Sequence, residues 1–240
     1  MATWTPHLGS DTAPTDAAPT QLNRLGIDGL PVPRLRGRIH EATAIPFALA
    51  GVTAAVQAGP PVHRVAILIF TVSTVAMLTA SAAYHCHSHS MEAKLSARRL
   101  DHAMIFVAIA GAQAAFWLIT APPVVAIGAI AVVAAIAFGG IHHKLNNLTL
   151  TGTSGSWLYI ALGWTGVAMV PFLVEAGDAT TIAAVLGGGL VYSAGGGVLA
   201  RRLVDPWPKV FGYHEVWHLM VVCGVVAHFS GLVRLVVTAA

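Results

Sequence analysis

The chain has 240 residues, of which 56% are hydrophobic and only 10% are charged, and its formal net charge is +3 at pH 7. Because an average soluble domain carries roughly 25% charged residues, this composition excludes an ordinary soluble protein and indicates an integral membrane protein. No basic segment interleaved with aromatic residues occurs, so we expect anionic lipid rather than nucleic acid as a partner. Cys86 and Cys223 lie far apart, which predicts free thiols.

The first 40 residues are rich in proline and contain few large apolar side chains. Such a segment cannot bury enough apolar surface to fold. We therefore predict a disordered cytoplasmic tail over residues 1–40 and a transmembrane domain over residues 41–240. A cleaved signal peptide is disfavoured, because the first apolar stretch begins only after residue 41.

Apolar stretches of about 17 to 25 residues, the length of a membrane-spanning helix, recur along the rest of the chain. Residues 121–123, Ala-Pro-Pro, separate the third and fourth stretches and predict a tight helical hairpin; a buried turn there would leave six spans. The predicted fold is an all-α bundle of seven transmembrane helices. We place them at approximately 42–59, 64–85, 101–120, 122–141, 155–174, 180–200 and 214–237.

Basic residues predict the orientation of these spans, because Lys and Arg accumulate in cytoplasmic loops. All but two of the 13 basic residues fall in the tail and the alternate loops on its side of the membrane; the exceptions are Arg64 and Arg234. The amino terminus is therefore predicted to be cytoplasmic and the carboxyl terminus extracytoplasmic, in the cell membrane.

Polar and ionisable residues at the ends of three spans form the candidate site, since such groups are costly near a membrane unless paired or metal-bound. Ser81 and His85 end the second span, Asp101 opens the third, and His214 and His218 open the seventh. The predicted topology places all of them at cytoplasmic helix ends, at one depth.

The residue types favour a zinc site. His214 and His218, four residues apart, share a helix face, and His85 supplies a third nitrogen, leaving a fourth position open as in catalytic zinc sites. Asp101 would orient or deprotonate a metal-bound water, whose pKa falls toward about 7, and Ser81 shares the face of His85. The alternatives are capping or snorkelling histidines, a helix-packing serine and an aspartate that caps the third span.

The segment His214-Glu215-Val216-Trp217-His218 also matches the HExxH pattern of zinc proteases, in which the glutamate is the general base. No Asp or Glu follows Glu215, and His228 lies roughly 15 Å beyond His218 along the helix. A third ligand must therefore come from upstream, which disfavours a protease and assigns the base to Asp101. His40, Glu41, His102 and His228 are expected at most to surround the site or to join helices.

Three motifs in this order resemble the hemolysin III family, the bacterial branch of the progestin and adipoQ receptor superfamily, which includes the adiponectin receptors. They are residues 81–85, Ser-Ala-Ala-Tyr-His; 98–102, Arg-Arg-Leu-Asp-His; and 211–218, Phe-Gly-Tyr-His-Glu-Val-Trp-His. The resemblance runs from about residue 35 to 237. It implies a seven-helix bundle with a cytoplasmic amino terminus and a zinc ion held by His85, His214 and His218, with Asp101 and Ser81 beside the metal-bound water.

The chain departs from that family in its third helix, where Gly111-Ala112-Gln113-Ala114-Ala115 replaces a Gly-Thr-Tyr-Thr-Pro-like stretch. Loss of the proline would straighten this helix and alter the cavity while leaving the ligands intact.

Two functions fit the same ligands. The first is a zinc-dependent membrane hydrolase acting on a lipid amide or ester that enters between helices. The second is a non-enzymatic membrane-homeostasis sensor or receptor-like protein in which zinc joins helices structurally. A cation or proton transporter is disfavoured, because the middles of the first, third, fourth and fifth spans carry no charge and no inverted repeat is evident. A secreted pore-forming toxin is disfavoured by the missing secretion signal and the apolar composition.

Overall fold

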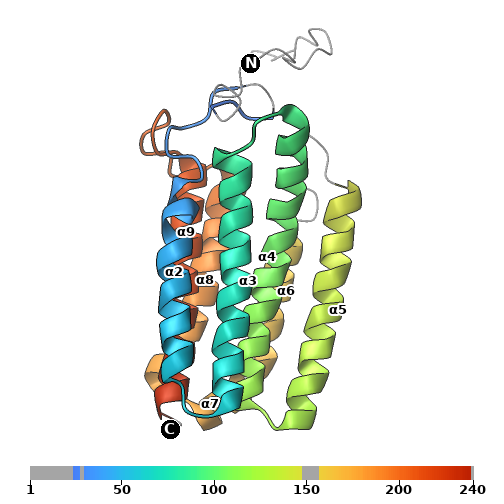
Figure 1. Ribbon diagram of the computed structural model, residues 1–240, viewed down its shortest axis with the longest axis vertical. Helices are drawn as coiled ribbons and strands as arrows, with labels where there is room; N and C mark the ends of the chain where they lie inside the picture. Colours follow the sequence, from blue (N-terminus) through green and yellow to red (C-terminus); the bar gives the residue numbers. More distant parts are fainter. Residues whose placement is uncertain (1–23, 28–29, 148–156, 239–240) are drawn as a thin grey trace, which may run out of the picture.

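The computed structural model describes residues 24–27, 30–147 and 157–238, and its helices run side by side along one axis (Figure 1). Within these residues no strand forms, and seven helical segments are long and apolar enough to span a membrane. The predicted all-α, seven-helix bundle is confirmed. Its elements are α2 (Arg38–Gln57), α3 (Pro61–Cys86), α4 (Met91–Thr120), α5 (Pro123–Asn147), α6 (Trp157–Trp164), η1 (Thr165–Met169), α7 (Val170–Ala176), α8 (Ala179–Arg201) and α9 (Tyr213–Thr238).

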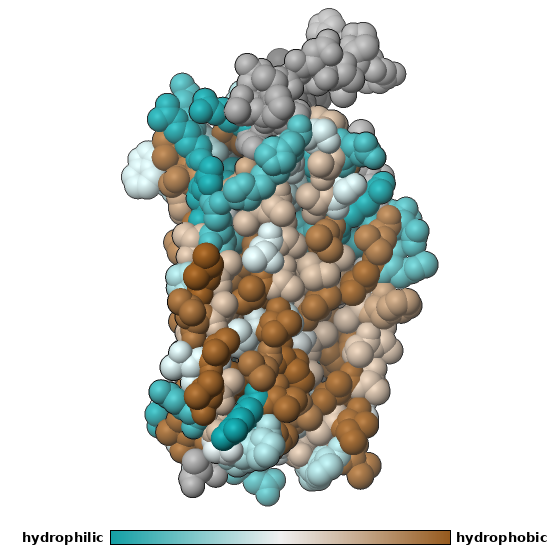
Figure 2. Space-filling view, in the orientation of Figure 1, coloured by the Kyte–Doolittle hydropathy of each residue, from teal (hydrophilic) through white to brown (hydrophobic). Residues whose placement is uncertain are grey.

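On the face that Figure 2 shows, apolar side chains cover the middle of the bundle and hydrophilic ones gather toward its two ends. Ile45, Val72 and Phe138 are 72%, 65% and 72% exposed, respectively. Because each helix satisfies its own backbone hydrogen bonds, it can present such side chains directly to lipid. The hydrocarbon region of a bilayer therefore accounts for an apolar surface that water would not tolerate.

Helices α4 and α5 extend furthest beyond the apolar stretches that predict them. Helix α4 begins at Met91 rather than near residue 101, because the Ser90 hydroxyl accepts a hydrogen bond from the Ala93 amide at 3.1 Å and caps the helix. Helix α5 continues to Asn147, so that Lys144, expected in a loop, lies in its last turn and is buried. Hydropathy finds only the apolar part of such helices.

The fifth span is interrupted, because α6 passes into the 3₁₀ segment η1 before α7 resumes the α-helix. Pro171 stands at the start of α7, where its ring and missing amide prevent a continuous helix. The buried Gln113 of α4 hydrogen-bonds to the interrupted segment. Its amide nitrogen donates to the Leu162 carbonyl at 2.6 Å, and its oxygen accepts from the Thr165 hydroxyl at 3.1 Å. The unusual third-helix sequence thus places a polar side chain where an interrupted neighbour needs hydrogen bonds.

Helices α8 and α9 pack closely through glycines. A Cβ added at Gly188 would lie 2.4 Å from the His228 ring, and one at Gly224 would lie 2.7 Å from the Tyr192 ring. The His228 ring lies 2.8 Å from the Val185 carbonyl oxygen and hydrogen-bonds across the same interface. Small residues allow such backbone approach inside a membrane.

We expect Gly188→Ala to destabilise the protein by about 1 to 3 kcal/mol, because the added methyl group collides with His228 and with the Gly224 carbonyl. Gly187→Ala is the matched control, since a Cβ there meets nothing within 4 Å. Thermal unfolding of both variants in one detergent measures the difference. Equal stability of the two would contradict the close packing of α8 on α9.

Candidate metal centre

Three histidines meet at one end of the bundle. His85 lies in the last turn of α3, and His214 and His218 lie in the first two turns of α9. Among the described residues their ligand atoms form a group within 4.8 Å of one another. Two atoms that share one zinc ion lie at most about 4.2 Å apart, because each zinc–nitrogen bond is about 2.1 Å long. The three rings are therefore nearly close enough together to hold one metal ion between them.

The histidine group fits a metal by its burial as well as by its spacing. The rings of His85 and His218 are buried, and Nδ1 of His218 has no hydrogen-bond partner among the described residues. A buried polar nitrogen without a partner costs about 1–3 kcal/mol. An imidazole nitrogen that the protein leaves without a partner suits a cation that accepts nitrogen ligands, as zinc does.

Asp101 lies at the depth of the histidines. A Cβ added at Gly111 would lie 2.1 Å from the Ser73 hydroxyl oxygen, which fixes the register of the antiparallel helices α4 and α3. Equal counts along both helices bring Asp101 level with Ala83, between Ser81 and His85. The residues expected in one layer therefore share a level, although they come from distant parts of the sequence.

The polar residues Ser81 and Asp101 do not hydrogen-bond to the three histidines. Ser81 is buried on α3 one turn before His85, and no hydrogen bond from its hydroxyl forms within the described residues. Asp101 is buried on α4, and its Oδ2 lies 3.6 Å from Nδ1 of His102. The structure thus brings the three histidines together, whereas the Ser81 hydroxyl and the Asp101 carboxylate lie at a similar depth without a hydrogen bond to them.

Glu215, the glutamate of the HExxH pattern, has a structural role. Its side chain is fully buried, with Oε2 accepting from the Gly212 amide at 2.8 Å and Oε1 lying 2.5 Å from Nε of Arg36. The first contact caps the start of α9 and the second joins α9 to the segment before α2. Both carboxylate oxygens are therefore engaged away from the histidines.

Residues 33–37, called the strap here, cross this end of the bundle. The amides of Arg34 and Leu35 donate to the carbonyls of Lys209 and Val210 at 3.1 and 3.0 Å. Gly37 has a φ of 78°, and a Cβ there would lie 2.4 Å from Cβ of His85. The strap belongs to the predicted tail, of which residues 1–23 lie outside the described residues. Its packing was missed; Arg36, one of three arginines just before the first span, was the available signal.

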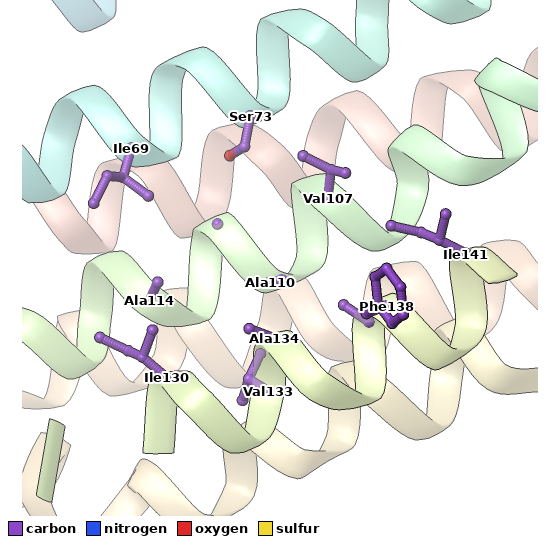
Figure 3. A pocket seen from close by; sticks show the side chains of 12 residues that line it. Ile69, Ser73, Val107, Ala110, Ala114, Ile130, Val133, Ala134, Phe138 and Ile141 are labelled. Carbon is purple, nitrogen blue, oxygen red and sulfur yellow. The ribbon is translucent and has the colours of Figure 1, made fainter. Parts of the chain in front are cut away.

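A separate groove lies between α3, α4 and α5, away from the histidines (Figure 3). It is an open groove with a volume of about 430 Å³, lined almost wholly by apolar side chains, with the Ser73 hydroxyl as its polar group. Figure 3 shows Ile69 and Ser73 reaching it from α3, Val107 and Ala114 from α4, and Phe138 from α5. Its chemistry suits a hydrocarbon chain.

Comparison with known proteins agrees with this architecture. The chain is 29% identical over 160 residues to "Hemolysin-3" of Bacillus cereus, a match that covers 67% of this chain and 70% of that protein. It is 26% identical over 165 residues to "Hemolysin-3 homolog" of Bacillus subtilis (strain 168), covering 69% and 74%. The family described as "Haemolysin-III related" matches residues 30–229, a region that includes the strap and all three histidines. The chain therefore belongs to the Haemolysin-III related family of membrane proteins.

Proposed function

We propose that the protein is a zinc-dependent membrane hydrolase that acts on a lipid amide or ester. The observation that carries this proposal is the group of His85, His214 and His218, whose ligand atoms lie within 4.8 Å of one another at one end of an apolar bundle. Three histidines leave a fourth position for a reacting group, as in catalytic zinc sites.

Each residue then has a distinct task. Zinc, when bound, would supply Lewis-acid chemistry, polarising a carbonyl and lowering the pKa of a water toward about 7. Asp101 takes the proton of the attacking water and later returns it to the leaving group, acting as general base and acid. Ser81 donates a hydrogen bond to the substrate carbonyl from the face that it shares with His85.

A lipid substrate is supported by the apolar groove of Figure 3. Val107, which lines it, lies six residues beyond Asp101 on α4, or about 9 Å along the helix. A hydrocarbon chain that leaves the groove at Val107 would place its polar end about 9 Å from the level of Asp101. We propose that the histidine end of the bundle faces the cytoplasm of the cell, since most basic residues of the chain belong to it.

A structural metal in a sensor or receptor-like protein is the second candidate. Its supporting observation is that His85 comes from α3 while His214 and His218 come from α9, so that one ion would join two helices. In this case Asp101 has no chemical step to perform, and its Oδ2 lies 3.6 Å from Nδ1 of His102.

Metal analysis tests the site that both functions share. We expect about one zinc ion per purified chain and its loss in His85→Ala, because two histidines on one helix hold zinc weakly. His89→Ala is the matched control, since His89 is exposed just beyond the end of α3 and lies outside the ligand group. Retention of zinc by His85→Ala would contradict the three-histidine site.

Asp101→Asn separates the hydrolase from the structural site. We expect this variant to keep zinc and thermal stability while its turnover of a short-chain ceramide-like amide or a lipid ester falls by a factor of at least 10². The measurement is product formation by protein in lipid nanodiscs. Zinc binding without turnover by the wild-type protein on any such substrate would refute the hydrolase.

A further inference from the structure

A fourth histidine, His40, lies against the metal centre. Its ring stacks on that of His218, with centroids 4.0 Å apart and an angle of 14° between the planes. The residue lies in the first turn of α2 and is 3% exposed. Neither of its ring nitrogens makes a hydrogen bond of ordinary geometry among the described residues, and the His218 backbone offers it only a weak contact. Burying this polar ring beside the ring of His218 therefore costs free energy, because the ring has left water without gaining a good hydrogen bond in the protein.

The position of His40 along its helix puts it in the same layer as the candidate reacting groups. A Cβ added at Gly51 would lie 2.1 Å from the Thr71 hydroxyl oxygen, which fixes the register of the antiparallel helices α2 and α3. Equal counts along both helices bring His40 level with Ala82, one residue from the level of Asp101. The unsatisfied nitrogens are therefore at the depth where a substrate would meet the metal.

The stacked arrangement excludes His40 as a fourth ligand. An imidazole nitrogen binds a metal in the plane of its ring, and the planes of His40 and His218 are nearly parallel. The centroids of the two stacked rings are 4.0 Å apart, so the ring nitrogens of His40 and His218 lie in separate, nearly parallel planes and do not converge on one position. Consistently, His40 is not part of the group whose ligand atoms lie within 4.8 Å of one another.

We propose that His40 is a positioning residue whose ring nitrogen hydrogen-bonds the non-protein group at the open coordination position, namely a substrate oxygen or a small anion. This role rests on the proposed metal site but not on turnover. Stacking on His218 holds the ring, and the hydrogen bond satisfies a nitrogen that the protein leaves without a good partner. In this arrangement His218 binds the metal, and the ring of His40 stacked on it positions the substrate oxygen or anion.

The test uses full-length protein loaded with Co²⁺ and titrated with acetohydroxamate, a small oxygen chelator, while the visible absorption of the metal is followed. His40→Phe keeps a stacked aromatic ring and removes both nitrogens. We expect it to retain one cobalt ion per chain and to bind acetohydroxamate about tenfold more weakly, the effect of one lost hydrogen bond. His40→Gln, which restores a donor and an acceptor, should recover affinity to within about threefold of wild type.

His63→Phe is the matched control. His63 is also buried and its Nδ1 also has no partner among the described residues, but it lies in the first turn of α3, roughly 33 Å from His85 along the helix. Its acetohydroxamate affinity should equal that of wild type. If His40→Phe does not fold, His40→Leu replaces it, with the same expected weakening relative to His40→Gln.

The outcomes distinguish the two proposals. Unchanged affinity in His40→Phe would overturn the role of His40 alone, and so would loss of cobalt from that variant, which would make His40 a ligand. Wild-type protein without metal would overturn the metal centre and the role of His40 together. Metal binding and weakened affinity without lipid hydrolysis would refute only the hydrolase.

Discussion

Gly37→Ala is expected to impair metal binding more than any substitution outside the ligands. The glycine has a φ of 78°, a conformation that costs an L-residue about 1–2 kcal/mol. The added Cβ would also lie 2.4 Å from Cβ of His85, which is backbone-adjacent and cannot rotate away. The strap and the end of α3 must therefore separate, and His85 moves with them. We expect at least a tenfold loss of zinc affinity and an unfolding free energy lower by about 2 to 4 kcal/mol.

Gly59→Ala is the control for this experiment, because Gly59 has no positive φ and a Cβ there meets nothing within 4 Å. Zinc affinity is measured by competition with a chromophoric chelator, and stability by thermal unfolding of the metal-free protein. Wild-type zinc affinity in Gly37→Ala would show that the strap does not define the position of His85.

The position of the strap could not be predicted from the sequence, unlike the seven spans. The seven spans follow from hydropathy because lipid acts on each helix separately, and the pairing of His214 with His218 follows from helix periodicity. The position of the strap depends instead on Arg36 meeting Glu215, a contact between residues 179 positions apart. No local pattern specifies such a pair, so a polar, proline-rich segment was expected to be disordered.

The contact of His40 depends on where the first helix begins, which was predicted a few residues too late. The first span was predicted to begin near residue 42, because the hydrophobic run begins there, whereas α2 begins at Arg38. The additional turn places His40 inside the bundle and against His218. A hydropathy pattern does not detect the charged and polar residues of the first helical turn, although these residues determine what the helix end contacts. The grouping of the three histidines could thus be predicted, and His40 was expected near the same layer, but its stacking on His218 could not be predicted.

Breaking the ion pair of Arg36 and Glu215 is expected to cause the second large loss of stability. Glu215 is fully buried and Arg36 is 15% exposed, so Arg36→Met leaves a carboxylate in the interior without its cation. Removing one partner of a buried ion pair costs about 3–5 kcal/mol, whereas removing both is far less costly. We therefore expect Arg36→Met to be severely destabilised and Arg36→Met/Glu215→Gln to recover much of the loss.

Glu215→Gln alone decides between this structural role and that of a protease base. The glutamine retains an oxygen for the Gly212 amide, and Arg36 can still reach solvent, so this variant should be less destabilised than Arg36→Met. Unfolding free energies of the two single variants and the double variant form a double-mutant cycle, which measures the coupling directly. Zinc content and lipid turnover per folded molecule should stay near wild type.

Abolished turnover of Glu215→Gln at unchanged stability would instead assign Glu215 to the chemistry, as the HExxH pattern alone suggests. The hydrogen bond to Gly212 and the ion pair to Arg36 argue for the structural role, because they engage both carboxylate oxygens that a general base would need.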